Sequence, residues 1–479
     1  MESKNGIVWF RQDLRLHDNE ALTEALRHCD NIIPVFVFDE RVFMGQTRWF
    51  GFPKTGMFRA NFIIESVQDL RRSLRRLGSD LIVRIGKPEE EIFALARKYK
   101  TSWVFCNRER TQEEEEVQDA LERKLWSIGQ EMRYTRGKLL YYTSDLPFPI
   151  THTPDIFTQF RKEVERAVPV RMPLPAPATM PPIDPDIVPG EIPELERLGH
   201  KDFVADHRAA LAFMGGETAG LERLRYYLWE KDLAKTYFDT RNEMLGGDYS
   251  TKFSPWLAQG CLSPKTIYWE LKRYEQERGE NKSTYWIFFE LLWRDFFRLM
   301  AKKHGNRIFL KGGLKNEPVS RLRNDRSVLQ VWMDGRTGVP FIDANMRELK
   351  LTGFMSNRGR QNVASFLVND LKVNWQMGAE YFESVLIDYD TASNWCNWNY
   401  VAGVGNDPRE DRYFNILGQA RRYDPQGLYV KHWLPELEHL PPDKVHQPDR
   451  LSGKEQAEFH LTLGADYPKA MLSTGRWER

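Results

Sequence analysis

The sequence predicts a parallel α/β domain at the N-terminus, followed by a domain built entirely of helices. Over the first 135 residues, short β-branched and aromatic runs alternate with helical patterns. Nine of the 26 prolines then fall within residues 169–193. From about Asp206 onward, apolar residues recur at helical spacing and almost nothing alternates with a period of two.

In the N-terminal part, we expect strands and helices to alternate. The expected strands are 7–10, 32–38, 81–85 and 103–106, and the expected helices are 20–28, 58–77, 89–99 and 112–128. A mostly parallel sheet binds ligands beyond the carboxyl ends of its strands. The segments after Phe10, Phe38 and Cys106 are therefore candidates for a small-molecule site, although no dinucleotide-binding glycine motif and no P-loop names the ligand.

The proline-rich segment 169–193 cannot form a regular helix or a central strand. We therefore expect three parts: an α/β domain over 1–135, a Pro-rich interdomain linker over 136–205 and an all-helical domain over 206–479. The helical part carries 11 of the 15 tryptophans.

Composition excludes several kinds of protein. With 479 residues and 41% hydrophobic content, the chain can build two or three cores. Lys and Arg (69) almost balance Asp and Glu (68), so any nucleic-acid contact must come from a local basic face. The cysteines form no CxxC pair and the histidines no metal-ligand spacing, which predicts reduced thiols and no metal. No run of about 18 apolar residues exists and a strand begins too early for a signal peptide, so we expect no membrane span and a cytoplasmic location.

Residues 354–403 carry the most informative pattern of the chain. Polar residues interrupt helical stretches that are rich in aromatic rings: Asn357, Arg360, Asp388, Asp390 and Asn394 stand among Trp375, Trp395, Trp398 and Tyr400. Burying a carboxylate among aromatic rings is costly unless it is paired. The pattern predicts that these groups converge on a planar, redox-active cofactor, for which a flavin is the natural candidate. An arginine of this region is expected to reach Asp388 or Asp390, either beside the cofactor or as a purely structural ion pair.

The turn at residues 249–254 offers consecutive backbone N–H groups, the hydroxyls of Ser250, Thr251 and Ser254, and the cation of Lys252. Such a turn before a helix suits a phosphate or pyrophosphate. The alternative is an ordinary helix N-cap with Pro255 in the first turn.

Glu290, Trp293, Arg294 and Phe297 share one face of an expected helix. A hydrogen-bonding group beside a stacking plane is how a protein grips a base taken out of a duplex. The alternative is a solvated ion pair between Glu290 and Arg294.

Six stretches taken together resemble the photolyase and cryptochrome family. They read WFRQDLRLHDNEAL, DYSTKFSPWLAQGCLSP, ELLWRDFFR, GFMSNRGRQNVASFLV, LIDYDTASNWCNWNY and YDPQGLYVKHWLPEL, and they run in order over nearly the whole chain. Within the family the chain looks like the DASH-type cryptochromes, because Gln361 and Tyr400 stand where classical cyclobutane-dimer photolyases tend to carry Met and Trp. Neither Asn357 nor Gln361 is the histidine that a (6-4) photolyase would carry there.

The resemblance implies an N-terminal antenna domain with a five-stranded parallel sheet and a helical domain that holds FAD. The implied pyrophosphate contacts are Tyr237, Ser250, Thr251, Lys252, Phe253 and Ser254, and the implied contacts near the flavin ring are Asn357, Arg360, Asp388, Asp390 and Asn394. The implied lesion contacts are Glu290, Trp293, Asn357 and Tyr400, and the implied DNA-backbone contacts are Arg358 and Arg412. Glu109 and Lys311 match positions near the methenyltetrahydrofolate antenna of this subfamily.

The implied activity is that of a deoxyribodipyrimidine photolyase, in which photoexcited reduced FAD gives an electron to a cyclobutane pyrimidine dimer. The resemblance also implies a preference for single-stranded or looped DNA, and we expect a monomer. The main alternative is a blue-light photoreceptor that signals through partners, although only about 30 residues follow His446 and signalling relatives commonly append long disordered tails. A third function is nucleic-acid binding that keeps FAD without photochemistry.

Photoreduction in this family usually runs through three tryptophans. Trp398 and Trp375 match the first two, whereas the third position, ten residues before Trp332, is Leu322. Either the alignment slips in the loop 315–328 or the outer relay is missing. We therefore expect slow photoreduction unless another surface aromatic residue substitutes.

Overall fold

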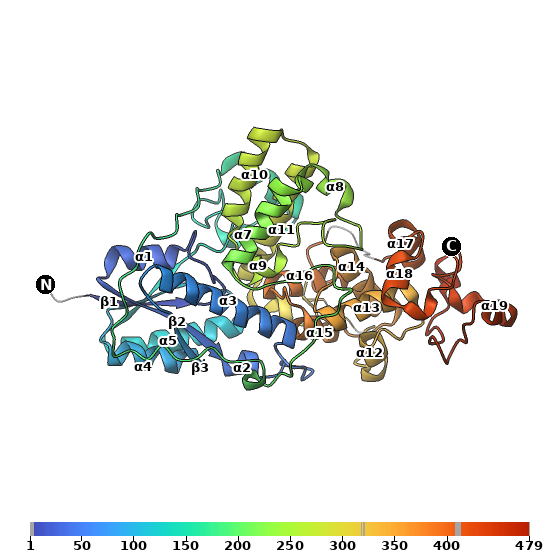
Figure 1. The fold of residues 1–479 in the computed structure, drawn as a ribbon, viewed down its shortest axis with the longest axis horizontal. Coiled ribbons are helices and arrows are strands. Elements are labelled where there is room, and N and C mark those ends of the chain that lie inside the picture. The colour runs from blue at the N-terminus through green and yellow to red at the C-terminus, as the bar shows by residue number, and fades with distance from the viewer. Residues whose placement is uncertain (1–3, 318, 320, 408–412, 479) are drawn as a thin grey trace.

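A five-stranded parallel sheet forms the N-terminal domain of the computed structural model, which describes residues 4–317, 319, 321–407 and 413–478 (Figure 1). The strand order is β3-β2-β1-β4-β5. The strands are β1 (Asn5–Phe10), β2 (Asn31–Asp39), β3 (Ile82–Gly86), β4 (Trp103–Asn107) and β5 (Glu131–Thr135). The four strands expected from their β-branched and aromatic runs are confirmed to within two residues.

Helices cover both faces of this sheet, which is why its strands read as nearly continuous apolar runs. They are α1 (Glu20–His28), α2 (Glu40–Phe43), α3 (Met57–Arg76), α4 (Pro88–Lys98) and α5 (Gln112–Trp126). Alternate residues of β1 enter different cores, because successive side chains of a strand point to opposite faces. Ile7 and Trp9 pack with α4 and α5, whereas Val8 and Phe10 join α1, α3 and the core that continues into the helical domain.

Between the domains, the proline-rich segment 169–193 contains no helix or strand, and it runs along the edge of the sheet. Val83 of β3 donates its N–H to the carbonyl of Pro189 (2.7 Å), and Arg71 donates to the carbonyl of Gly190 (2.8 Å). The range 136–205 is not irregular throughout, because it also holds the helix α6 (Phe157–Ala167).

The second half of the chain is helical, which confirms the predicted fold class. From residue 206 on, the described residues form no strand of a sheet; only isolated bridges join Arg323 to Val373 and Leu463 to Tyr467. The helices are α7 (Glu217–Arg225), α8 (Tyr237–Thr240), α9 (Ser254–Ala258), α10 (Pro264–Arg278), α11 (Lys282–His304), α12 (Arg326–Met333), α13 (Pro340–Thr352), α14 (Asn357–Ser365), α15 (Trp375–Val385), α16 (Thr391–Val401), α17 (Ile416–Tyr423), α18 (Leu428–Trp433) and α19 (Gly453–Glu458). Of the helices in the described part of the chain, none is long and apolar enough to cross a membrane.

Buried carboxylates tie the helical domain to the segments that precede it. Asp295 of α11 accepts the backbone N–H groups of Leu140 (3.1 Å) and Tyr141 (3.0 Å) in the linker range. Glu380 of α15 accepts those of Trp49 and Phe50 in the N-terminal domain, both at 2.9 Å. Each carboxylate thus replaces its lost hydration with backbone donors from outside the helical domain.

Candidate flavin site and neighbouring cavities

A cavity in the helical domain gathers most of the residues that the sequence singled out. It has an empty volume of about 1280 Å³, including its opening to solvent. Thirteen of the predicted site residues line it: Tyr237, Ser250, Thr251, Lys252, Phe253, Ser254, Glu290, Asn357, Arg360, Asp388, Asp390, Asn394 and Trp398. They come from α8, the turn before α9, α11, α14, the segment before α16, and α16 itself. Segments more than 150 residues apart in sequence therefore form one site.

Lys252 of this cavity combines a strained backbone with an unsatisfied side chain. Its backbone is left-handed (φ 54°), a conformation that costs a non-glycine residue energy. Its side chain is 3% exposed, and its Nζ has no hydrogen-bond partner within the described structure. The ammonium lies over the ring of Tyr249, 3.4 Å from the centroid, and burial lowers the pKa of Lys252 to about 7. A buried cation without a hydrogen-bond partner, on a residue that lines a cavity, fits an anionic ligand.

The N-cap alternative for the turn at 249–254 is not what the structure shows. Helix α9 begins at Ser254, and its N-cap residue, Phe253, has no side-chain cap bond. The Ser254 hydroxyl instead donates to Asp388 Oδ2 at 2.6 Å. The turn is therefore tied to the opposite wall of the cavity.

Arg360 forms the predicted ion pair, and Asp388 is its partner. Arg360 Nη2 lies 2.8 Å from Asp388 Oδ2. The other oxygen, Asp388 Oδ1, is buried and has no hydrogen-bond partner among the described residues. This leaves an acceptor next to the cavity, which the N–H or hydroxyl groups of a bound cofactor would satisfy.

Asp390 has a different role, although it was predicted beside Asp388. It pairs with Arg298 and caps α16 by accepting the N–H of Ser393 at 2.8 Å. Burial alone would raise the pKa of Asp390, but Arg298 and Arg294 outweigh it and hold that pKa below its ordinary value. Asn394, one turn into α16, lines the cavity and donates its amide to the carbonyl of Ala379 at 3.0 Å.

The structure divides the four predicted lesion contacts into two pairs. Glu290 and Asn357 line the cavity, whereas Trp293 and Tyr400 lie in edge contact with each other (6.1 Å between centroids) and are not part of its lining. One face of the Trp293 indole is stacked on Phe157 of α6, with centroids 3.7 Å apart and ring planes 8° apart. The aromatic pair is therefore next to the cavity without opening into it.

The alternative of a Glu290–Arg294 ion pair is wrong. Glu290 pairs with Arg241, a cavity residue that no local sequence pattern indicated. Arg294 turns to the carbonyls of Lys138 (2.8 Å) and Leu257 (3.3 Å), and burial lowers the pKa of its guanidinium to about 10. The i,i+4 spacing predicted that Glu290 and Arg294 would lie close together along one helix. Glu290 instead pairs with Arg241, which directly follows α8.

Of the two relay tryptophans, Trp398 lines the cavity and Trp375 is fully buried. The Trp398 ring lies against α15 one turn beyond Trp375, because a Cβ at Gly378 would be 2.3 Å from Trp398 Cη2. Leu322 is buried, and hydrogen bonds through Lys311 link it to Trp375. The indole N–H of Trp375 donates to the Lys311 carbonyl (3.0 Å), and Lys311 Nζ donates to the Leu322 carbonyl (3.3 Å). The position expected for a third relay tryptophan thus holds an aliphatic, inward-facing side chain.

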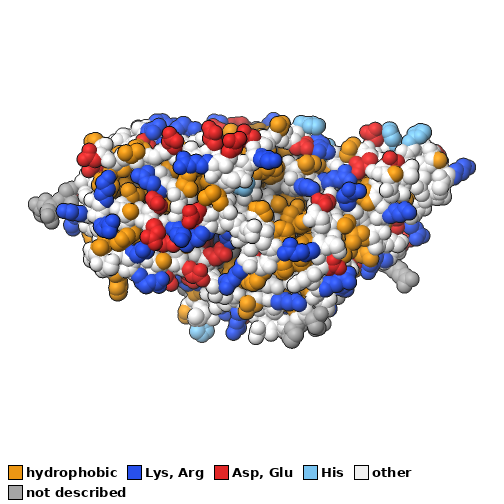
Figure 2. Space-filling view, turned by 90° about the horizontal axis from the view of Figure 1, so that it is seen from below, with side chains coloured by type: hydrophobic (Ala, Val, Ile, Leu, Met, Phe, Trp, Pro, Cys, Tyr) orange, Lys and Arg blue, Asp and Glu red, His pale blue; other side chains and the backbone are white. Residues whose placement is uncertain are grey.

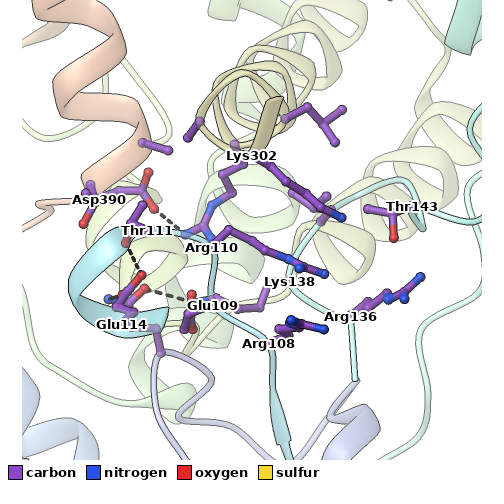
Figure 3. A pocket seen from close by; sticks show the side chains of 17 residues that line it. Arg108, Glu109, Arg110, Thr111, Glu114, Arg136, Lys138, Thr143, Lys302 and Asp390 are labelled. Atoms are coloured by element: carbon purple, nitrogen blue, oxygen red, sulfur yellow. Dashed lines mark hydrogen bonds and ion pairs between the residues drawn. The ribbon is translucent and has the colours of Figure 1, made fainter. Parts of the chain in front are cut away.

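A second cavity lies between the domains, and Figure 3 shows basic side chains directed into it. Glu109, predicted near an antenna, lines it and pairs with Lys138. Burial by itself would raise the pKa of Glu109, but Lys138 outweighs it and lowers that pKa. The other predicted antenna residue is not in this cavity, because Lys311 lies beyond the end of α11 against Leu322. Lys302, in the last turn of α11, takes that place.

The sequence analysis missed the six cations that line this second cavity: Arg108, Arg110, Arg136, Lys138, Arg298 and Lys302. Burial, followed by repulsion from Arg110, Arg136 and Arg108, lowers the pKa of Lys302 to about 8. A signal for three of them was present, because Arg108, Arg110 and Arg136 follow the carboxyl ends of β4 and β5, where a parallel sheet binds ligands.

The two predicted DNA-backbone arginines fare differently. Arg358 is half-buried, donates to Asn242 Oδ1 (2.9 Å) and lies over the ring of Tyr423. Arg412 lies outside the described residues. On the face seen in Figure 2, basic and acidic side chains are mixed over the N-terminal half and hydrophobic side chains gather near the centre. Among the described residues, no group of three or more His, Cys, Asp or Glu side chains could hold a metal ion.

Comparisons with known proteins identify the family of the chain. The family model of DNA photolyase matches residues 6–180, and that of the FAD binding domain of DNA photolyase matches residues 286–477. The chain is 54% identical over 472 residues to Cryptochrome DASH of Gloeobacter violaceus, covering 98% of this chain and 94% of that protein. It is 47% identical over 475 residues to Cryptochrome DASH of Xenopus laevis, covering 99% of this chain and 90% of that protein.

Solved structures show the same fold. The crystal structure of a cryptochrome from Synechocystis sp. superposes with a TM-score of 0.96 at 49% identity, covering 100% of this chain and 98% of that one. A class III photolyase from Agrobacterium tumefaciens gives 0.85 at 27% identity, covering 100% and 96%. The chain therefore belongs to the photolyase and cryptochrome family, as a DASH-type cryptochrome.

Proposed function

We propose that this protein repairs cyclobutane pyrimidine dimers with blue light and FAD. The observation that carries the proposal is the cavity of the helical domain. It combines an unpartnered cation at Lys252, an unsatisfied acceptor at Asp388, and the carboxylate of Glu290 within one turn of the Trp293–Tyr400 pair. The proposed occupant of the inner part is FAD, and that of the outer part is a flipped dimer.

The residues of the cavity fit FAD on chemical grounds. The ammonium of Lys252 and the hydroxyls of Ser250 and Thr251 would hold the pyrophosphate, whose charge compensates the buried cation. Arg360, fixed by Asp388, would lie beside the flavin ring. When bound, reduced FAD supplies the photoexcited electron that splits the dimer.

The side chains of this protein would stabilise charge at the flavin ring and bind and orient the lesion. Arg360 and Asp388 hold a fixed charge pair at the ring, so that no reorganisation is needed when negative charge moves. Arg241 orients the carboxylate of Glu290, whose pKa is raised by burial, so that it can share a proton with a polar edge of the lesion. Trp293 and Tyr400 would stack against the flipped bases once Phe157 yields.

We also propose that single-stranded or looped DNA is the preferred substrate. Unstacking a dimer costs least when the strand is already single. Tyr400 is smaller than the Trp of classical dimer photolyases, and one face of Trp293 is covered by Phe157. Less aromatic surface is therefore available to stack on the flipped dimer and to offset the cost of unstacking it from a duplex.

For the cavity between the domains, we propose an anionic antenna, methenyltetrahydrofolate. Six cations line it against the three carboxylates of Glu109, Glu114 and Asp390. Lys138 pairs with Glu109 and Arg298 with Asp390, so that Arg108, Arg110, Arg136 and Lys302 outnumber the remaining acid. Carboxylate groups such as those of a folate tail suit this cluster of cations. Gently purified protein should then show an absorbance band distinct from that of flavin.

One observation favours a second function, that of a blue-light photoreceptor with little repair. The stacking of Phe157 on Trp293 covers an aromatic face that repair requires. A receptor would keep the photochemistry of the flavin and lack light-dependent loss of dimers.

The deciding experiment illuminates the reduced protein with dimer-containing oligonucleotides, single-stranded and duplex. Wild type should repair, Glu290→Ala and Trp293→Ala should each lose about tenfold or more in rate, and Trp126→Ala, at a 72% exposed tryptophan, should not. Equal rates on both substrates would refute the strand preference. No repair by a wild type whose flavin still photoreduces would replace the proposed function with that of the receptor.

A further inference from the structure

An aromatic path leads from the buried relay tryptophan to the surface in a direction that the sequence did not indicate. The ring of Trp375 contacts that of Trp395 in α16, with centroids 5.7 Å apart and planes at 78°. Trp395 in turn contacts Trp49 of the N-terminal domain, with centroids 5.6 Å apart and planes at 67°. Trp375 and Trp395 are buried, whereas Trp49 is 41% exposed.

Trp395 also touches the wall of the flavin cavity by a second route. Its indole N–H donates to the hydroxyl of Tyr389 at 3.2 Å, and Tyr389 lines the flavin cavity. Tyr389 donates its own proton to Glu383 at 2.8 Å. Trp395 is therefore one hydrogen bond from the cavity on one side and one ring contact from Trp375 on the other.

The direction usually taken by the relay is closed here. Leu322 is aliphatic and buried. Trp332, whose ring is 6.5 Å from that of Trp398, is fully buried and donates its N–H to the Val363 carbonyl. The described chain of ring contacts runs from Trp375 to Trp395 and then to Trp49. Trp49 is its exposed, oxidisable end.

The surroundings of Trp49 suit a positive charge. Its backbone N–H donates to Glu380, which also accepts bonds from Phe50 and Thr47. Burial raises the pKa of Glu380, and these three donors oppose that rise by favouring the ionised carboxylate. Arg48 lies 5.8 Å from the Trp49 ring and opposes this effect, but it is exposed, so solvent screens its charge. Trp49 and Trp395 both line a cavity at the carboxyl ends of the strands, with an empty volume of about 1870 Å³ including its opening to solvent, and a small reductant could reach them through it.

We propose that Trp395 and Trp49 form the outer end of the electron relay that reduces the flavin. This rests on the proposed function, because it requires a photoexcited flavin in the cavity. One electron leaves Trp398 for the cavity and is replaced from Trp375, then from Trp395 and then from Trp49. Trp49 recovers its electron from a dissolved thiol, which releases its proton to solvent, and two oxidised thiols combine to a disulfide. The relay thus ends at Trp49 in the N-terminal domain and does not use position 322.

The test compares Trp49→Phe, Trp395→Phe and a control, Trp126→Phe, in the FAD-loaded protein under blue light with a thiol reductant. Flavin photoreduction should fall about tenfold in Trp49→Phe and in Trp395→Phe, and it should be unchanged in Trp126→Phe, whose indole makes no described ring contact with the relay. Electron paramagnetic resonance with ring-deuterated tryptophan should find the long-lived radical at Trp49 in wild type and should lose it in Trp49→Phe.

Dimer repair by chemically reduced protein separates this proposal from the proposed function. Repair should stay at the wild-type rate in Trp49→Phe, since a flavin that is already reduced needs no relay. A wild-type photoreduction rate in Trp49→Phe, or a radical that stays in place without residue 49, overturns the proposal whether or not the protein repairs DNA. If Trp395→Phe fails to fold or bind FAD, the surface variant Trp49→Phe alone decides.

Discussion

Flavin affinity should depend on pH through Lys252. Burial lowers the pKa of this ammonium from 10.5 to about 7, and no described group accepts a hydrogen bond from it. A pyrophosphate bound beside Lys252 would restore an ordinary pKa, because the anion favours the charged form. The free protein and the complex then hold different numbers of protons above pH 7.

The sign and size follow from proton counting. Below pH 7, Lys252 is protonated in both states, and affinity does not change with pH. Above pH 7 the free protein loses a proton that the complex keeps, so that binding weakens by up to about 1.4 kcal/mol per pH unit. Between pH 7 and pH 9, with partial ionisation included, the loss is about fiftyfold, or about 2.3 kcal/mol.

The assay is fluorescence titration of flavin-depleted protein with FAD at pH 7, 8 and 9. Lys252→Met should bind more weakly at pH 7 and show no slope. Lys252→Arg should also show no slope, because arginine stays charged throughout this range. A wild type whose affinity is the same at all three pH values, or a slope that persists in Lys252→Met, would refute the assignment of the pyrophosphate to this lysine.

Four further outcomes are expected. Asp388→Asn should lower the free energy of unfolding by about 3 kcal/mol, since it leaves Arg360 without its carboxylate, and urea titration would measure this; a change within error would contradict the pairing. Gly378→Ala should destabilise by about 1–3 kcal/mol, because its Cβ would lie 2.3 Å from Trp398 Cη2, and the same titration would test it. Lys302→Met should remove the antenna absorbance band while Lys311→Met keeps it; the reverse result would restore Lys311 to the antenna site. Leu322→Trp should raise the photoreduction rate by less than about twofold, because an exit through Trp49 already exists, and a larger gain would contradict that exit.

Local patterns predicted the fold and part of the cavity. The strands appear in the sequence as β-branched runs, and the cost of burying a carboxylate indicated an arginine paired with Asp388 or Asp390, of which the structure shows Arg360 with Asp388. The local sequence of the turn at 249–254 is compatible with either a phosphate site or a helix N-cap. The resemblance to the family favours the phosphate site. The structure shows the Ser254 hydroxyl bound to Asp388, a contact across 134 residues.

What the sequence missed depended on contacts between distant segments. Arg241 reaches Glu290 across 49 residues, and helical spacing carries no information about such a partner. The stacking of Phe157 on Trp293 joins a segment expected as linker to a proposed lesion contact. Lys302 and Lys311 are nine residues apart in a lysine-bearing stretch, and only the end of α11 between them decides which one faces the second cavity.

The prolines after residue 169 do more than separate two domains. A sheet edge exposes unpaired N–H and C=O groups that recruit strands from other molecules. Here the N–H of Val83 donates to the carbonyl of Pro189. Because proline has no N–H, Pro189 cannot donate a hydrogen bond to a further strand. Gly190 follows at φ 79°, where an added Cβ would lie 2.3 Å from the Val83 carbonyl oxygen. The proline-rich segment 169–193 thus covers the β3 edge of the sheet. Proteolysis within this segment would expose the edge of β3 to pairing with strands of other molecules, which favours aggregation.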